Sequence, residues 1–191
     1  MTYTKRFDEA LAMASELHRH QMRKGKDVPY ITHLLGVASL VGANGGDEDQ
    51  VIAGLLHDAI EDCVDEVPDV AARIERRFGS RVLSIVDGCT DAYEMPKPPW
   101  KERKIAYLAH LRELPDDSAI YLVSLADKVH NARAIVADLG RVGDALWDRF
   151  NAGRRGSLWY YDALAEIFAD QHPGYLADEL SACVRKMNAI G

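Results

Sequence analysis

The sequence predicts an all-α protein built around one hydrophobic core. Apolar residues recur at helical spacing from the first segment onward. In that segment they are Phe7, Ala10, Leu11, Ala14 and Leu17. The alternating apolar and polar pattern of a half-buried strand is missing. No linker divides the 191 residues, so we expect one domain over residues 1–191.

Breaker residues separate the helices expected in the first half of the chain. A loop rich in charge follows the first helix at residues 23–29. Asp47 followed by Gln50 resembles a capping box, and Gly79 is placed to end one helix before the next begins. The helices expected after the loop are about Thr32–Val41, one that starts after Asp47 and carries His57 and Asp58, Val70–Phe78, and Ser80–Cys89.

Residues 92–99 contain three prolines and predict a mobile loop, with basic residues on and after it. The helices expected beyond it are one to about Leu114, one from Asp116 or Asp117 to Leu139, and then about Val142–Gln171 and Pro173–Met187. Gly140 is placed to end the long helix, and Pro173 suits a first helical position.

Composition excludes several classes of protein. The net charge of −7 argues against general nucleic-acid binding, which usually needs a basic face. The three cysteines are odd in number and far apart, so we expect neither a disulfide framework nor a zinc knuckle, and we expect a reducing cytoplasm. The sequence contains neither the apolar core of a signal peptide nor an apolar run long enough to span a membrane, so we expect no membrane segment.

The run from Gly54 to Asp62 is the strongest functional signal. His57 and Asp58 are adjacent, lie among apolar residues and offer an imidazole and a carboxylate to one metal ion. One helical turn later come Glu61 and Asp62. Four polar side chains in an apolar setting are costly unless a metal or a substrate satisfies them. The alternative is a charged outer face that happens to carry a histidine.

Two further metal ligands are candidates on other predicted helices. His33 begins the second helix, and Asp127 lies mid-helix among apolar residues, where propensity and burial both disfavour a carboxylate. Taken alone, His33 can be a satisfied core or capping histidine. Asp127 alone can form a salt bridge with a neighbouring basic side chain.

The four residues occur in an order that resembles the HD-domain metal-dependent phosphohydrolases. The resemblance is closer still to the hydrolase domain of the RelA/SpoT-type alarmone enzymes, including the stand-alone small alarmone hydrolases. It covers about residues 5–170 and implies a hydrolase without a synthetase domain. The matching stretches are His20-Gln-Met-Arg-Lys-Gly, Pro29-Tyr-Ile-Thr-His, Ala53-Gly-Leu-Leu-His-Asp-Ala-Ile-Glu-Asp, Phe78-Gly-Ser-Arg-Val and Leu125-Ala-Asp-Lys-Val-His-Asn-Ala-Arg.

The resemblance implies a role for each matching residue. One divalent metal ion, usually Mn²⁺ in such enzymes, would be bound by His33, His57, Asp58 and Asp127. Glu61 and Asp62 match the paired acids of the alarmone hydrolases and would be catalytic. The residues expected to contact the substrate are Arg23, Lys24, Asn131, Lys97, Lys101 and Tyr160.

Some of these substrate contacts have plain alternatives. Arg23 and Lys24 can belong to a solvated turn, and Tyr160 can be a core or interface residue. The sequence departs from the family pattern at Leu34, where a proline is frequent, and at Cys63, where a threonine is common. Residues 94–99 align ambiguously, which leaves open the lysine that meets phosphate.

The implied reaction removes the 3′-pyrophosphate of guanosine 3′,5′-bis(diphosphate) or of the pentaphosphate, giving GDP or GTP and pyrophosphate. The rival substrates are adenosine 3′-pyrophosphates, NADPH and other nucleotides, because the base pocket cannot be read from the sequence. A non-catalytic alarmone sensor is a further alternative, although all four ligands and both acids are present. We expect a small-molecule nucleotide as the partner, and neither nucleic acid nor a membrane; the oligomeric state stays open.

Overall fold

The computed structural model describes residues 2–92 and 96–190, and over these the predicted all-α class is confirmed. One isolated bridge, between Met22 and Pro29, is the extent of β-structure in the described chain. The helices are α1 Lys5–Leu17, α2 Ile31–Ala43, α3 Glu48–Leu56, α4 Ala59–Cys63, α5 Val70–Phe78, α6 Ser80–Cys89, α7 Trp100–Glu113, α8 Ala119–Val142, the 3₁₀ helix η1 Gly143–Arg149, α9 Gly153–Gln171 and α10 Tyr175–Ala189. None of these helices is long and apolar enough to span a membrane.

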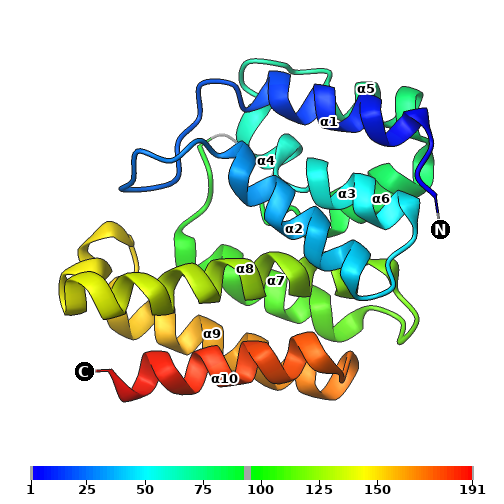
Figure 1. Cartoon of the computed structure of the whole chain (residues 1–191). Coiled ribbons are helices and arrows are strands. Elements are labelled where there is room, and N and C mark those ends of the chain that lie inside the picture. Colours follow the sequence, from blue (N-terminus) through cyan, green and yellow to red (C-terminus); the bar gives the residue numbers. More distant parts are fainter. Residues whose placement is uncertain (1, 93–95, 191) are drawn as a thin grey trace.

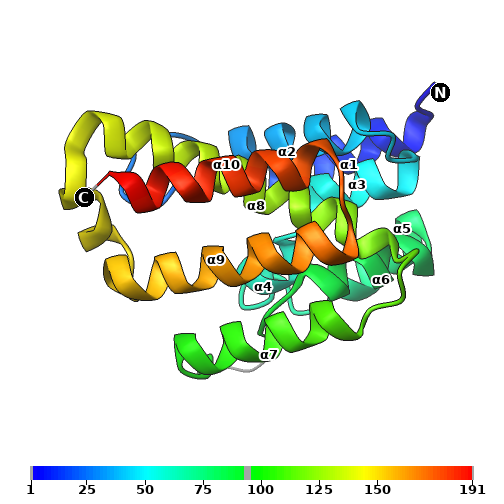
Figure 2. The same cartoon turned by 90° about the horizontal axis from the view of Figure 1, so that it is seen from below.

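The long helix α8 is the centre of the fold. It packs against α2, α3 and α6 on one side and against α10 and η1 on the other. Figure 1 shows α1 and α5 at the top, α9 and α10 at the bottom, and α8 crossing between them. Seen from below, α9 lies between α10 and α7, as its contacts require (Figure 2). Because α8 is covered on several sides, it buries side chains around most of its circumference, and every residue from Tyr121 to Asp127 is buried.

Several local signals of the sequence act as expected. The Asp47 side chain accepts from the Gln50 backbone N–H, and the Gln50 side chain accepts from the Asp47 backbone N–H, so the capping box is confirmed. Gly79 ends α5 and precedes α6 with a φ of +91°, a conformation that glycine adopts without strain.

The helix expected to carry His57 and Asp58 is instead broken at these residues. α3 ends at Leu56, α4 begins at Ala59, and the two functional residues occupy the turn between them. The prediction of one continuous helix was therefore wrong. At the break, the His57 ring donates to the Gly54 carbonyl oxygen, 2.9 Å away. This bond satisfies a carbonyl that a continuous helix would pair with a backbone N–H group.

The other differences lie in the second half of the chain. The segment expected as one helix over Val142–Gln171 is divided into η1 and α9, with glycines of positive φ at Gly143 and Gly153. α8 continues through Gly140, and its N-cap is Ser118, whose hydroxyl accepts from the Ile120 backbone N–H. Of the predicted loop at 92–99, residues 93–95 lie outside the described part of the chain.

Helices α2 and α3 approach each other unusually closely. A Cβ atom added to Gly54 on α3 would lie 3.2 Å from the Cα atom of Ala38 on α2. The absence of a side chain at Gly54 therefore sets the distance between these helices. His33 lies in the first turn of α2 and His57 directly follows α3, so the same contact holds the two histidines near each other.

Candidate metal centre and substrate pocket

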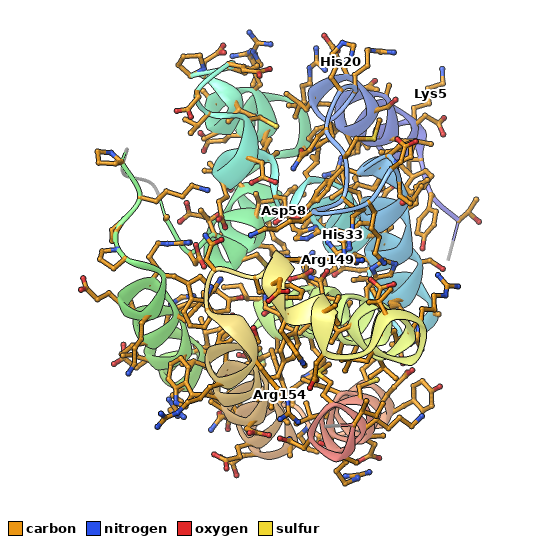
Figure 3. All side chains as sticks on the ribbon, turned by 90° about the vertical axis from the view of Figure 1, so that its left-hand side faces the viewer. Lys5, His20, His33, Asp58, Arg149 and Arg154 are labelled. Atoms are coloured by element: carbon orange, nitrogen blue, oxygen red, sulfur yellow. The ribbon has the colours of Figure 1, made fainter. Side chains whose placement is uncertain are left out.

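Three segments bring the four predicted metal ligands together. α2 supplies His33, the α3–α4 turn supplies His57 and Asp58, and the middle of α8 supplies Asp127. The His33 Nε2 atom lies 3.2 Å from Asp127 Oδ1 and 3.7 Å from Asp58 Oδ2. The His57 Nε2 atom lies 2.9 Å from Asp58 Oδ2 and 3.6 Å from Asp127 Oδ1. Figure 3 labels His33 and Asp58 in the middle of its view of the molecule.

The two imidazoles present nitrogen atoms that have no hydrogen-bond partner. Both Nε2 atoms are buried and unpaired. The His57 Nδ1 atom must carry a proton, because it faces the Gly54 carbonyl oxygen, which can only accept. In a neutral His57 the Nε2 lone pair therefore points at the Asp58 carboxylate, and either a proton on Nε2 or a bound metal ion relieves this contact. The ligand atoms of His33, His57 and Asp58 all lie within 4.8 Å of one another, and Asp127 Oδ1 lies 3.2 and 3.6 Å from the two histidines. A set of imidazole and carboxylate donors of this kind fits a divalent transition-metal ion.

Neighbouring donors hold both carboxylates of this cluster. Asp127 accepts from the Lys128 ammonium at 2.6 Å and from the Asn131 side-chain amide at 2.6 Å. Asp58 accepts from the Tyr30 hydroxyl at 2.6 Å. Burial alone would raise the pKa of Asp127, but Lys128 and the two histidines hold that pKa well below its usual range. The Asp127 carboxyl is therefore ionised at neutral pH.

Charge and burial affect the two imidazoles differently. Burial lowers the pKa of His57, but the carboxylates of Asp58 and Asp127 outweigh it and hold that pKa well above the usual value. Burial dominates at His33 and lowers its pKa. The His33 Nδ1 atom lies 2.8 Å from Nδ1 of His130. Burial and the charge of His33 lower the pKa of His130 to about 4.

The two predicted acids lie in the first turn of α4, beside the cluster. The Glu61 carboxylate accepts from Lys97 at 3.0 Å and lies 3.6 Å from the Arg103 guanidinium. The Asp62 carboxylate accepts from the side-chain amide of Gln21 at 2.8 Å. Burial, and then the charge of nearby carboxylates, raises the pKa of each acid. The two acids therefore have different partners, one cationic and one neutral.

A cavity of 410 Å³ opens next to these residues and is strongly basic. Four of the six predicted substrate contacts line it: Arg23, Lys24, Asn131 and Tyr160. The other cationic side chains in its wall are Lys26, Arg103, Lys104, Lys128 and Arg149. Asp138 supplies a carboxylate to the same wall, where it binds Lys26 at 2.6 Å and Arg149 at 3.2 Å. The wall is thus suited to a multiply charged anion.

Two predicted contacts lie elsewhere. Lys97 is not in the cavity lining and binds Glu61 instead. Lys101 is exposed and lies over the Trp159 ring, 5.9 Å from its centroid. Their neighbours Arg103 and Lys104, which belong to the same basic stretch, take the position in the cavity wall.

The loop before α2 carries Arg23 and Lys24 to the cavity. The two arms of the loop are joined by a hydrogen bond from the Arg23 backbone N–H to the Val28 carbonyl, at 2.8 Å. Gly25 turns the loop with a φ of +68° and lies against Arg149, whose Cδ atom would be 2.8 Å from a Cβ there. Arg23 reaches the Asn131 side-chain oxygen at 2.6 Å, which ties the loop to α8.

An HD-domain family model matches residues 10–158 of this chain. The chain belongs to the HD-domain family. This HD-domain chain is 37% identical over 142 residues to a protein of Xenopus tropicalis named guanosine-3′,5′-bis(diphosphate) 3′-pyrophosphohydrolase MESH1, covering 73% of this chain and 72% of that protein. The mouse MESH1 protein is 34% identical over the same shares.

The chain also resembles longer proteins and solved structures. It is 31% identical over 172 residues to the bifunctional (p)ppGpp synthase/hydrolase SpoT of Escherichia coli, and this match covers 88% of this chain but 22% of SpoT. The structure of a metazoan ortholog of SpoT superposes with a TM-score of 0.76 at 22% identity, over 97% of both chains. A Listeria monocytogenes crystal structure gives a TM-score of 0.68 at 27% identity, over 80% of this chain and 96% of that one. The two superpositions show that this chain shares its fold with both solved structures.

Proposed function

We propose that this chain hydrolyses guanosine 3′,5′-bis(diphosphate) and the corresponding pentaphosphate at the 3′ position. Water attacks the phosphorus bonded to the 3′-oxygen, the bond between them breaks, and the products are pyrophosphate with GDP or GTP. The observation that carries this proposal is the convergence of two unpaired imidazole nitrogens and two carboxylates beside a cavity lined by basic side chains. Relatives named for this reaction support it.

We further propose that His33, His57, Asp58 and Asp127 hold one divalent metal ion, Mn²⁺ in the first instance. When bound, such an ion lowers the pKa of water and polarises a phosphate oxygen. Tyr30 orients Asp58 through its hydroxyl, and Asn131 and Lys128 orient Asp127. These bonds fix the ligand oxygens before a metal binds, as supporting contacts do in metal sites generally.

Glu61 and Asp62 would move the protons of the reaction. Hydrolysis needs one group that takes a proton from the attacking water and one that gives a proton to the leaving 3′-oxygen. Two buried carboxyls with raised pKa values serve both needs, because one can hold a proton while the other is ionised. Arg23, Lys24 and the cations of α7 would offset the phosphate charge.

The cysteines and the cavity support two further parts of the proposal. A cytoplasmic location is proposed on the sequence alone, whose three cysteines are odd in number and far apart. The partner would be a small-molecule nucleotide, with Tyr160 and Trp100 in the cavity wall available to the nucleoside.

A comparison of substrates on the chelator-stripped protein tests the function. Guanosine 3′-pyrophosphates, adenosine 3′-pyrophosphates and NADPH are incubated with and without Mn²⁺, and pyrophosphate, phosphate and nucleotide products are measured. We expect Mn²⁺-dependent pyrophosphate release, fastest from the guanosine compounds. Faster turnover of an adenosine compound or of NADPH would show that the guanosine compounds are not the preferred substrates. Nucleotide binding without any product would indicate a non-catalytic sensor.

Two variants test the metal ligands in the same assay. Asp58→Ala and Asp127→Ala should each abolish Mn²⁺-dependent turnover and weaken Mn²⁺ binding. Asp117→Ala is the matched control, because Asp117 is exposed before α8 and far along the helix from the cluster. Full activity in either ligand variant would refute the proposed metal centre.

A further inference from the structure

His130 contacts the metal cluster without belonging to it. It follows Asp127 by three residues on α8, so one helical face presents both side chains toward His33. The rings of His33 and His130 have centroids 4.8 Å apart, and their Nδ1 atoms lie 2.8 Å apart. This is a hydrogen bond between two imidazoles, in which one ring donates and the other accepts.

The surroundings of His33 decide which ring donates. The His33 Nε2 atom faces Asp127 and Asp58, at 3.2 and 3.7 Å, and makes no hydrogen bond. A nitrogen that is to bind a metal ion must carry a lone pair. The proton of a neutral His33 is then on Nδ1, and the Nδ1 atom of His130 must accept it. His57 reaches the same state by another route, since its Nδ1–H donates to a backbone carbonyl.

A glycine on α2 makes the position of His130 possible. Gly36 follows His33 by three residues, and a Cβ atom added there would lie 2.3 Å from Nε2 and 2.4 Å from Cδ2 of His130. Both distances are far inside van der Waals contact. An alanine at this position would therefore push the His130 ring away from His33 while leaving both histidines in the chain.

We propose that His130 is a positioning residue whose Nδ1 atom accepts a hydrogen bond from His33 and so holds the His33 ring in its Nδ1–H tautomer, and that Gly36 provides the space for it. The inference rests on the proposed metal centre. Ligand histidines usually donate to a carboxylate, a carbonyl or water. Here a neutral imidazole has that role, which adds no negative charge to a cluster that already holds two carboxylates.

Mn²⁺ binding to the stripped protein, followed by calorimetry, tests this inference without recourse to activity. Loss of such a supporting contact should weaken metal binding about 10- to 100-fold. We expect this loss of Mn²⁺ affinity in His130→Ala, and we expect Gly36→Ala to weaken Mn²⁺ binding as well. In the double variant, Gly36→Ala should add little, because its effect acts through His130.

Two substitutions outside the site are the matched controls. Gly140→Ala replaces a helical glycine of α8, where the added Cβ atom meets nothing within 4 Å, and His110→Ala removes an exposed histidine of α7. Both should bind Mn²⁺ as the wild type does. Additive losses from Gly36→Ala and His130→Ala would show that Gly36 acts on the fold and not through His130.

A conservative variant and a spectroscopic measurement separate positioning from packing. His130→Asn offers a side-chain oxygen that can accept from His33 Nδ1, and it should recover most of the affinity. Nitrogen NMR of the Zn²⁺-loaded protein should place the His33 proton on Nδ1. Wild-type affinity in His130→Ala, or a His33 proton on Nε2, would overturn the inference alone. A wild-type protein that binds no metal ion would overturn the proposed metal centre, and this inference with it.

Discussion

Substitution of Gly54 by alanine tests whether the contact between α2 and α3 sets the spacing of the two metal-binding histidines. The added Cβ atom would lie 3.2 Å from Cα and 3.4 Å from the backbone N of Ala38. Backbone atoms cannot rotate away as a side chain can. The two helices must therefore separate by a few tenths of an ångström, and His33 would move relative to His57.

The size of the effect follows from two opposing terms. Glycine in a helix is less favourable than alanine by about 1 kcal/mol, so the substitution gains up to that amount. Overpacking a tight contact costs about 1–3 kcal/mol. We therefore expect Gly54→Ala to lower the free energy of unfolding by about 0–2 kcal/mol. Gly140→Ala, which meets no atom within 4 Å, should show only the gain.

Urea denaturation of the metal-free proteins measures this difference, which should be about 1–3 kcal/mol between the two alanine variants. Mn²⁺ titration of the same samples should show weaker binding in Gly54→Ala and unchanged binding in Gly140→Ala. The reasoning is refuted if Gly54→Ala is as stable as Gly140→Ala and binds Mn²⁺ as the wild type does.

Three further predictions concern single side chains. Glu61→Gln should keep Mn²⁺ bound but lose about 10²- to 10⁴-fold in kcat, the usual contribution of a positioned acid or base; wild-type turnover would remove Glu61 from the mechanism. Lys24→Ala should raise KM for the guanosine substrate with little change in Mn²⁺ affinity, because Lys24 lines the cavity and binds Asn151 rather than the cluster. The Arg81 guanidinium lowers the pKa of Asp47 in the folded protein. The ion pair therefore stabilises the fold at pH values above the ordinary pKa of Asp, about 4. This stabilisation is lost as the pH falls through the lowered pKa of the folded protein. Unfolding measured against pH should therefore show wild type and Arg81→Met converging in acid; a gap that widens as the pH falls would contradict this.

The sequence predicted the helices well because their signals are local. Apolar periodicity located the helices, and the Asp47–Gln50 box and Gly79 marked ends that the structure confirms. The break between α3 and α4 was missed because the run through His57 contains neither glycine nor proline after Gly54. The bond from His57 to the Gly54 carbonyl and the packing around Asp58 stabilise the turn, and neither is visible in local propensity.

The sequence predicted the residues of the metal cluster more completely than those that line the cavity. Each of His33, His57, Asp58 and Asp127 is a polar group in an apolar segment, which is a signal in its own right. The added cavity residues carry no such signal. Lys26 and Arg149 are ordinary surface-type residues, and only the folding of the 18–30 loop against η1 brings them to one wall.

The distribution of charge explains how an acidic chain can hold a basic pocket. The net charge is −7, yet most cations of the wall already have a carboxylate partner. Asp138 binds Lys26 and Arg149, Asp91 binds Arg103 and Lys104, and Asp127 binds Lys128. These pairs limit the repulsion among the cations while the pocket is empty.

Arg23 and Lys24 differ from the other cations of the wall. Among the described residues, their hydrogen-bond partners are the amide oxygens of Asn131 and Asn151, which are neutral. A phosphate that binds Arg23 and Lys24 therefore displaces no carboxylate, whereas at Lys26 or Lys104 it must compete with one. The loop before α2 thus contributes the charge that is most available to the substrate, and it does so from a segment whose position depends on Gly25 and on the bond from Arg23 to α8.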